Sequence, residues 1–195
     1  MNNLIMNIPN IKMRPILYIF DVLKIKHKEN TLWLDFGVKC GGNANYISIK
    51  TDDKMYGFYN NNGFPEKWEN DTYVFTKIKD DLIVSNGPYN ETVKNFITTQ
   101  NKKISFIHID CDYYSSTKYV LNTIKNYIDN DCIIIFDELV NYPGFDGPNG
   151  ELKALYEFIT ENNINYKWIG MNGTINNNNN NIFESQSVAL ILNSI

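Results

Sequence analysis

The stretch ISFIHIDCDYYSSTKYVLNTIKNYIDNDCIIIFDE, residues 104–138, has the pattern that decides the fold. Residues 104–110 and 131–137 are short and almost continuously apolar, which is typical of strands buried on both faces of a parallel sheet. Between them, residues 115–128 carry apolar side chains at helical spacing, namely Val120, Leu121, Ile124 and Ile128. We therefore expect a strand, a helix and a second parallel strand, the repeating unit of an α/β fold.

The same alternation continues toward the N-terminus. Residues 31–36, 54–59 and 81–85 read as three further strands. A short helix is expected from about Asn43, and a longer one over residues 90–99. Most of the sheet is therefore expected to be parallel, with helices on both faces.

The C-terminal part has a different pattern. A Gly/Pro-rich loop at 141–150 leads into a helix whose core-facing side chains are Leu152, Leu155 and Ile159. Two candidate strands follow, at 166–171 and 187–192, separated by the asparagine tract 176–181. That spacing favours an antiparallel final pair joined by a long connection.

One domain accounts for the chain length. Its 195 residues show no internal repeat, so we expect a helical segment over 1–30 and a single domain over 31–195. In the first 28 residues, a helical stripe is formed by Ile16, Leu17, Phe20 and Leu23. Core packing is the favoured role for this helix; capping the site or meeting a partner chain are the alternatives, and a homodimer is left open.

Composition excludes several functional classes. A net charge of −4 provides no basic face for a phosphate backbone, so no nucleic-acid partner is expected. The three cysteines form no CxxC pair, which favours a reducing compartment. Because no apolar run approaches the roughly 20 residues of a membrane span, we expect a soluble cytoplasmic protein without a membrane partner.

The segment LDFGVKCGGN, residues 34–43, places three glycines between a strand and a helix. Gly37, Gly41 and Gly42 allow close backbone approach to a ligand, and the helix start directs N–H groups toward it. A nucleoside-type cofactor is the expected occupant. A tight turn without a ligand is the alternative, since the spacing is not the GxGxxG fingerprint.

Acidic side chains follow the two central strands. Asp110 and Asp112 end the first, and Asp137 and Glu138 end the second. If these strands are neighbours, the carboxylates meet at the edge where open α/β sheets bind ligands, and hard oxygen donors suit Mg²⁺. For Asp112, capping of the next helix is an equal alternative. His108 lies on the same strand face as Asp110 and could act as a base, although a structural histidine is favoured.

Taken in order, these segments resemble the class I S-adenosylmethionine-dependent methyltransferases of the macrocin O-methyltransferase (TylF-like) type. The resemblance rests on DFGVKCGGNANYIS, YGFYNNNGFPEKW, NGPYNETVKNF, ISFIHIDCDYYSSTKYVL and IIIFDELVNYPGF, and it covers most of residues 34–193. It implies a single doubly wound, mostly parallel seven-stranded sheet of the Rossmann-like methyltransferase fold.

The resemblance also implies the ligands. S-adenosylmethionine would bind at Asp35, Gly37, Gly41, Gly42, Asn43, Tyr59 and Asn60. Mg²⁺ would be held by Asp110, Asp137 and Glu138, with Asp112 beside them. The ion would lower the pKa of a sugar or glycan hydroxyl, and Asp110 would accept its proton.

One position departs from the family pattern. Where the family has an acid after the second strand, this chain has Tyr59 followed by Asn60. Tyrosine cannot reproduce a carboxylate's two-oxygen contact with the ribose hydroxyls, and each lost charge-assisted bond costs about 1.5 to 3 kcal/mol.

Three functions follow from the sequence. The first is a Mg²⁺-assisted O-methyltransferase acting on a sugar hydroxyl. The second, suggested by Tyr59, is a catalytically silent methyltransferase-like binding protein. The third is a metal-dependent enzyme of another class, such as a phosphate-ester hydrolase, because convergent carboxylates recur in unrelated chemistries.

Overall fold

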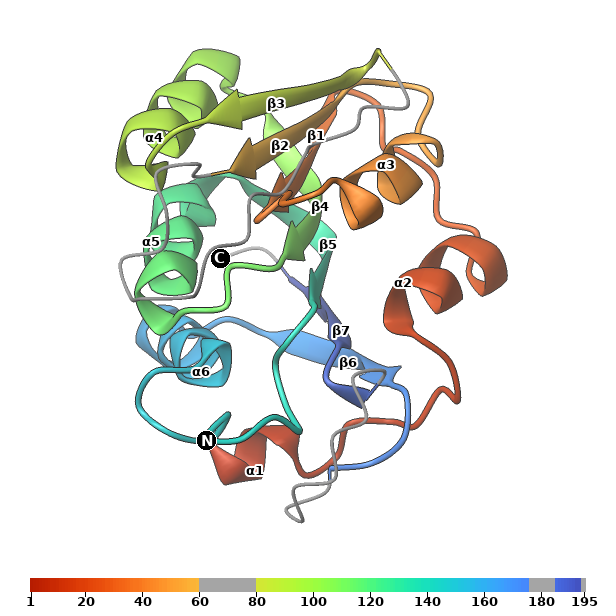
Figure 1. Ribbon diagram of the computed structural model, residues 1–195, viewed down its shortest axis with the longest axis vertical. Coiled ribbons are helices and arrows are strands. Elements are labelled where there is room, and N and C mark those ends of the chain that lie inside the picture. The colour runs from red at the N-terminus through yellow and green to blue at the C-terminus, as the bar shows by residue number, and fades with distance from the viewer. Residues whose placement is uncertain (60–79, 176–184, 194–195) are drawn as a thin grey trace.

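A computed structural model describes residues 1–59, 80–175 and 185–193 (Figure 1). Within these residues a seven-stranded sheet has the order β3-β2-β1-β4-β5-β7-β6. The first five strands in this order are parallel, while β7 runs antiparallel to both β5 and β6. The strands are β1 (Thr31–Phe36), β2 (Met55–Tyr59), β3 (Leu82–Asn86), β4 (Lys103–Ile109), β5 (Ile128–Phe136), β6 (Tyr166–Met171) and β7 (Val188–Leu192).

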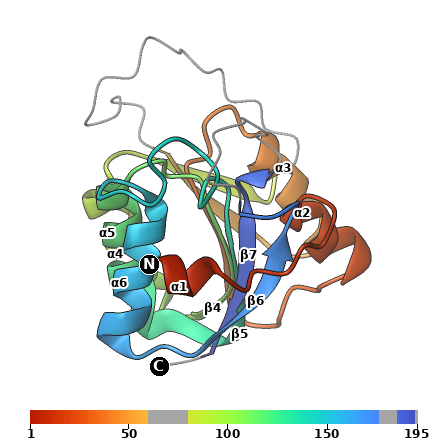
Figure 2. The same cartoon turned by 90° about the horizontal axis from the view of Figure 1, so that it is seen from below.

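Helices cover both faces of the sheet, as Figure 2 shows with the sheet nearly edge-on. Three longer helices lie on one face: α4 (Tyr89–Gln100), α5 (Tyr114–Ile124) and α6 (Glu151–Asn162). The other face is covered by α3 (Gly42–Ser48), α2 (Pro15–Leu17) and the π-helical turn η1 (Tyr18–Val22). The sequence prediction of a doubly wound, mostly parallel seven-stranded sheet is confirmed.

Alternation along β1 explains why both faces are buried. Leu32, Leu34 and Phe36 belong to the apolar cluster under α4, α5 and α6. Trp33, between them, belongs to the opposite cluster, where its ring lies 5.6 Å from that of Phe20. All six residues of β1 are buried, so this strand is central and positions whatever follows it.

The sequence prediction was wrong at two places. The helix expected over 115–128 ends at Ile124, a single 3₁₀ turn η2 (Lys125–Tyr127) follows, and Ile128 already begins β5. The helix expected in the first 28 residues is instead broken into α1 (Asn2–Ile5), α2 and η1.

Proline and left-handed backbone explain the broken N-terminal helix. Pro15 begins α2, and Lys12 and Lys24 have φ values of 59° and 52°. Of the predicted stripe, Ile16 and Phe20 are buried, while Leu17 and Leu23 are exposed. Core packing therefore holds for only half of the stripe.

The C-terminal elements agree with the sequence. The antiparallel pair β6 and β7 is confirmed, and the expected core residues of α6, Leu152, Leu155 and Ile159, are buried. The asparagine tract 176–181 lies outside the described residues. Among the helices of the described part, none is long and apolar enough to cross a membrane.

Candidate active site

Three parallel strands end side by side at one edge of the sheet. Phe36 of β1 is in register with Ile109 of β4, and Ile109 with Phe136 of β5. The backbone pairing continues beyond the strands, since Asp110 N donates to Phe36 O at 2.8 Å and Asp137 N to Ile109 O at 2.8 Å. The two acids are therefore placed next to each other at the carboxyl edge, where open α/β sheets bind ligands.

The glycine turn after β1 packs directly on this edge. Gly37 has a φ of +95°, and a Cβ at this position would lie 1.8 Å from the carbonyl oxygen of Asp110. Only glycine fits so close an approach. Gly41 also has a positive φ, +88°, and precedes the first turn of α3. Among the described residues, a Cβ on Gly42 would meet no atom within 4 Å.

Lys39, which the sequence analysis did not single out, lies between two of the predicted acids. Its Nζ is 3.3 Å from Oδ1 of Asp110 and 3.0 Å from Oδ2 of Asp112. Lys39 and Asp112 have φ values of 46° and 65°, a left-handed conformation that costs a residue with a side chain about 1 to 2 kcal/mol. The local fold maintains this strain at the residues that form the ion pair.

Asp137 has two other cationic neighbours. Nη2 of Arg14 lies 4.0 Å from its Oδ1, and Nε2 of His108 lies 3.9 Å from the same oxygen. Both distances are ion-pair distances and too long for hydrogen bonds. The N-terminal segment therefore contributes Arg14 to the edge of the sheet.

His108 and Asp35 form a buried pair beneath this edge. Nδ1 of His108 lies 2.6 Å from Oδ1 of Asp35, and each side chain is 1% exposed. Burial alone would lower the pKa of His108, but the carboxylates of Asp35 and Asp137 outweigh it and raise the pKa well above its ordinary value. The two carboxylates therefore favour the protonated form of His108, which lies behind Asp137 and away from solvent.

The acids at the edge have different proton affinities. Burial raises the pKa of Asp110 well above its ordinary value, and the charges of Asp137 and Asp112 add to this effect against the opposing charge of Lys39. Burial would also raise the pKa of Asp137, but the His108 imidazolium and Arg14 bring it below the ordinary value. Burial and the charge of Asp112 raise the pKa of Glu138. Asp110 is thus a better proton acceptor than an ordinary carboxylate.

The predicted Mg²⁺ site does not fit this arrangement. Within residues 1–59, 80–175 and 185–193, no group of three or more His, Cys, Asp or Glu side chains is arranged to hold a metal ion. Asp110 and Asp112, which would be donors, are instead paired with the Lys39 ammonium. An ammonium group, and not a metal ion, therefore lies between Asp110 and Asp112.

The predicted cofactor residues fall into three groups. Gly37, Gly41 and Gly42 form the turn beside Asp110, with Asn43 half-buried in the first turn of α3. Asp35 is buried against His108, and Tyr59 ends β2 half-buried. Asn60 lies outside the described residues.

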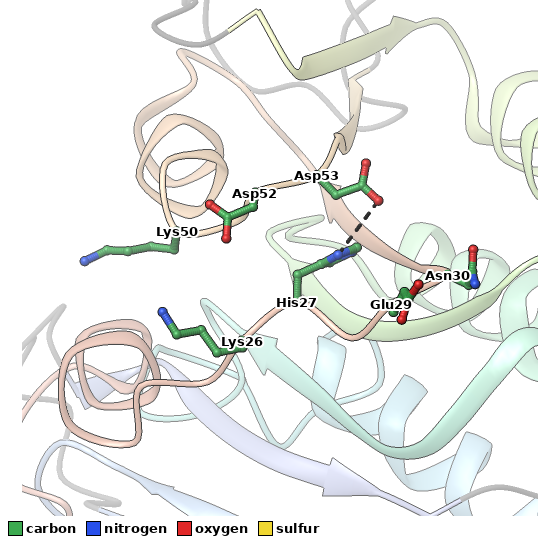
Figure 3. Close-up of a pocket in the computed structure, with 7 residues that line it drawn as sticks. All are labelled: Lys26, His27, Glu29, Asn30, Lys50, Asp52 and Asp53. Carbon is green, nitrogen blue, oxygen red and sulfur yellow. Dashed lines mark ion pairs between the residues drawn. The ribbon is translucent and has the colours of Figure 1, made fainter.

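A different cavity, of about 380 Å³, lies at the amino ends of β1 and β2, away from the carboxyl ends that carry the acids (Figure 3). It is lined by the segments that precede β1 and β2, namely Lys26, His27, Glu29, Asn30, Lys50, Asp52 and Asp53. His27 Nδ1 lies 3.9 Å from Asp53 Oδ2 across it. None of the predicted site residues lines this cavity.

Three further residues at the carboxyl edge escaped the sequence analysis. Lys39 could have been found from its place three residues after a central strand, facing the acid that ends the neighbouring strand. No pattern in the sequence indicated Arg14, because its approach to Asp137 depends on the path of the broken N-terminal segment. Glu151 is completely buried at the start of α6, where its Oε1 accepts hydrogen bonds from Cys111 N and Thr117 Oγ1 at 3.2 and 3.0 Å.

Comparison with known proteins places this fold. No protein-family model and no curated protein sequence matches the chain. Solved structures do match: CalS11, a TDP-rhamnose 3'-O-methyltransferase of calicheamicin biosynthesis, is 16% identical over 90% of this chain and 77% of its own, with a TM-score of 0.57. The O-methyltransferase NovP is 13% identical over 85% and 72%, with a TM-score of 0.58. TomG of Streptomyces achromogenes, solved with S-adenosylmethionine, is 10% identical over 92% and 78%, with a TM-score of 0.53.

The chain therefore has the fold of the class I S-adenosylmethionine-dependent methyltransferases, as expected from the sequence. At these identities the likeness concerns the fold, and what the chain does is a separate question.

Proposed function

We propose that this protein is an S-adenosylmethionine-dependent O-methyltransferase that acts on a sugar or glycan hydroxyl. The observation that carries the proposal is the position of Asp110, a half-buried carboxylate of raised pKa whose backbone lies directly against the glycine turn. Several solved structures of this fold are O-methyltransferases, and CalS11 acts on a sugar nucleotide. Mg²⁺ assistance, expected from the sequence, is not carried into the proposal because Lys39 holds two of the expected donors.

The chain's own residues supply orientation and proton transfer. Gly37, Gly41 and Gly42 would bind S-adenosylmethionine, which when bound supplies an electrophilic methyl group on a sulfonium. Asp110 would accept the proton of the acceptor hydroxyl as its oxygen bonds to the methyl carbon and the carbon–sulfur bond breaks. His108, behind the edge, would hold Asp137 in its ionised form.

A methyl-transfer assay tests the proposal. Radiolabelled S-adenosylmethionine is incubated with the protein and a panel of deoxysugar nucleotides and glycosylated small molecules, and label in the acceptor is measured. We expect transfer to at least one sugar hydroxyl. Asp110→Asn should lower kcat by roughly 100-fold to 10,000-fold, the usual contribution of a general base, while cofactor affinity changes little. An unchanged kcat in this variant would remove Asp110 from the reaction.

Tyr59 supports a second candidate, a methyltransferase-like binding protein that has lost the reaction. It stands at the end of β2, where the resembling family carries the ribose-binding acid. Calorimetric titration separates the two functions: absence of S-adenosylmethionine binding, together with absence of label transfer, would favour the second. The third function, a metal-dependent hydrolase, needs a metal cluster that the described residues do not form.

A further inference from the structure

We propose that the Lys39 ammonium takes the place of the divalent cation at this edge, so that methyl transfer proceeds without a metal ion. The inference rests on the proposed methyltransferase function and adds to it the identity of the positive group at the acceptor site.

Geometry is the first argument. Lys39 belongs to the glycine turn, and its Nζ contacts Asp110 at 3.3 Å and Asp112 at 3.0 Å. One cation thus joins the end of β4 to the turn after β1 and occupies Asp110, one of the ligands expected for the ion. Its side chain is 25% exposed and that of Asp112 is 8% exposed, so this pair lies within the protein rather than on its surface.

Local conformation is the second argument. The contact joins two residues that both have left-handed backbone, Lys39 and Asp112. Such strain persists only where the surrounding structure determines it, and it concentrates at functional sites. A lysine that reached the acids by a chance rotamer would not require this backbone at both partners.

Charge balance is the third argument. Four carboxylates gather at the edge, those of Asp110, Asp112, Asp137 and Glu138. Among the described residues, Lys39 contacts Asp110 and Asp112, and Arg14 lies 4.0 Å from Asp137. His108, 3.9 Å from Asp137, shares its charge between that carboxylate and Asp35. The charge of Lys39 also opposes the rise in the pKa of Asp110 and Glu138 and contributes to the lowered pKa of Asp137, so it reaches beyond its direct contacts. Protein groups therefore supply most of the counter-charge for which the sequence suggested Mg²⁺.

The chemistry differs from that of a metal site. An ammonium group donates hydrogen bonds to an oxygen but does not coordinate it as a Lewis acid. Asp110 would accept the hydroxyl proton, and Lys39 would stabilise negative charge that develops on the acceptor oxygen. The oxygen gains the methyl carbon, and the sulfur keeps the electron pair of the broken bond.

Mn²⁺ binding, followed by electron paramagnetic resonance, tests the inference directly. Chelator-treated wild-type protein should show no saturable Mn²⁺ binding. Lys39→Met leaves Asp110 and Asp112 without their cation, so it should show saturable Mn²⁺ binding that wild type lacks. Lys39→Arg retains the charge and should behave as wild type.

Lys118→Met is the matched control. Lys118 is also ion-paired, at 2.7 Å from Oε2 of Glu157, but it lies between α5 and α6 away from the site. Its replacement makes the same charge change and should leave Mn²⁺ binding unchanged. Thermal melts establish that each variant is folded.

Activity gives an independent readout. Wild-type methyl transfer should continue at an unchanged rate in excess EDTA, whereas Lys39→Met should lose it and regain part of it with Mg²⁺ or Mn²⁺. Saturable Mn²⁺ binding to wild type, or loss of wild-type activity in EDTA that Mg²⁺ restores, would overturn the inference even if Lys39→Met failed to fold. If no acceptor is methylated at all, the proposed function fails, and the Mn²⁺ titrations still decide the role of Lys39.

Discussion

Nδ1 of His108 lies 2.6 Å from Oδ1 of Asp35, and this pair is buried between β1 and β4. Because Asp35 and Asp137 raise the pKa of His108 despite its burial, we expect the imidazole to stay protonated at pH values well above 6.5, its ordinary pKa. Since the pKa of His108 is higher in the folded than in the unfolded protein, its protonation stabilises the fold. This stabilisation is complete below about pH 6.5 and is lost as the pH rises through the pKa of the folded state. NMR titration of the histidine ring signals measures the pKa, and urea unfolding across neutral and alkaline pH measures the stability.

Asp35→Asn is the corresponding variant. It removes the carboxylate and leaves a buried cation, so the free energy of unfolding should fall by about 3 to 5 kcal/mol near neutral pH. The pKa of His108 should fall as well. His108→Gln should lower the free energy of unfolding less in the Asp35→Asn variant than in wild type, since the two residues act as a pair. An ordinary His108 pKa in wild type would contradict the assignment.

Gly37 and Gly42 provide a second prediction, because they differ in what surrounds them. Gly37→Ala places a methyl group 1.8 Å from the Asp110 carbonyl oxygen at a φ of +95°, so we expect the free energy of unfolding to fall by about 2 kcal/mol or more. In Gly42→Ala the added methyl group meets no atom of the described residues within 4 Å, and alanine favours helix, so stability should be unchanged or slightly higher. Chemical unfolding of both variants checks these values.

The same Gly42 variant reports on the cofactor. If S-adenosylmethionine lies over the start of α3, the added methyl group should weaken its binding about tenfold, equivalent to about 1.4 kcal/mol. Calorimetry on Gly42→Ala measures this effect in a protein whose stability is intact. Equal affinity in wild type and variant would place the ligand elsewhere.

The sequence predicted most of the sheet for a physical reason. Parallel strands buried on both faces need continuous apolar runs, and residues 104–110 and 131–137 carry that signal without help from distant contacts. The prediction of one N-terminal helix was wrong because periodicity shows only which residues are apolar. Whether the backbone can continue as a helix is decided by Pro15 and by the left-handed conformation of Lys12 and Lys24.

The candidate site also has residues that could be placed from the sequence and residues that could not. Asp110 and Asp137 could be placed together because adjacent parallel strands end at one edge. Lys39 could be placed near this edge from its distance to a central strand, but its contact with the acids depends on a strained turn. Arg14 could not be placed, because the path of its segment is set by tertiary packing. The need for a counter-charge was visible in the sequence, but whether a metal ion or a lysine would provide it was not.

Tyr59→Asp tests whether the ribose pocket is otherwise complete. A carboxylate at the end of β2 could accept hydrogen bonds from the ribose hydroxyls, each worth about 1.5 to 3 kcal/mol, so cofactor affinity should rise at least about tenfold. Tyr59→Asn is the control, since it has the size of aspartate without the charge and should give a smaller gain. Titration with S-adenosylmethionine and S-adenosylhomocysteine measures both. No gain in either variant would mean that this position does not contact the ribose.

Glu151 is completely buried at the start of α6, and its pKa is raised well above the ordinary value of 4.5, chiefly by burial. The folded state therefore keeps a proton that the unfolded state releases, so the group makes the protein less stable as pH rises above about 4.5. Glu151→Gln keeps an acceptor oxygen for Cys111 N and Thr117 Oγ1 without the titration. Its free energy of unfolding, relative to wild type, should therefore increase from acid to neutral pH.

Glu157, on the same helix, should show the opposite sign. Its hydrogen bonds with Lys118 and Tyr114 lower its pKa, so it stabilises the fold above the ordinary value of 4.5 and loses this effect as pH falls. Glu157→Gln should therefore lose stability relative to wild type as pH rises from acid to neutral. Urea unfolding of both variants over that range separates the two carboxyls, because any general effect of removing one negative charge would shift both curves in the same direction. Parallel curves would mean that Glu151 is ionised in the folded protein, and the buried carboxyl would then need a cation that its hydrogen-bond partners do not supply.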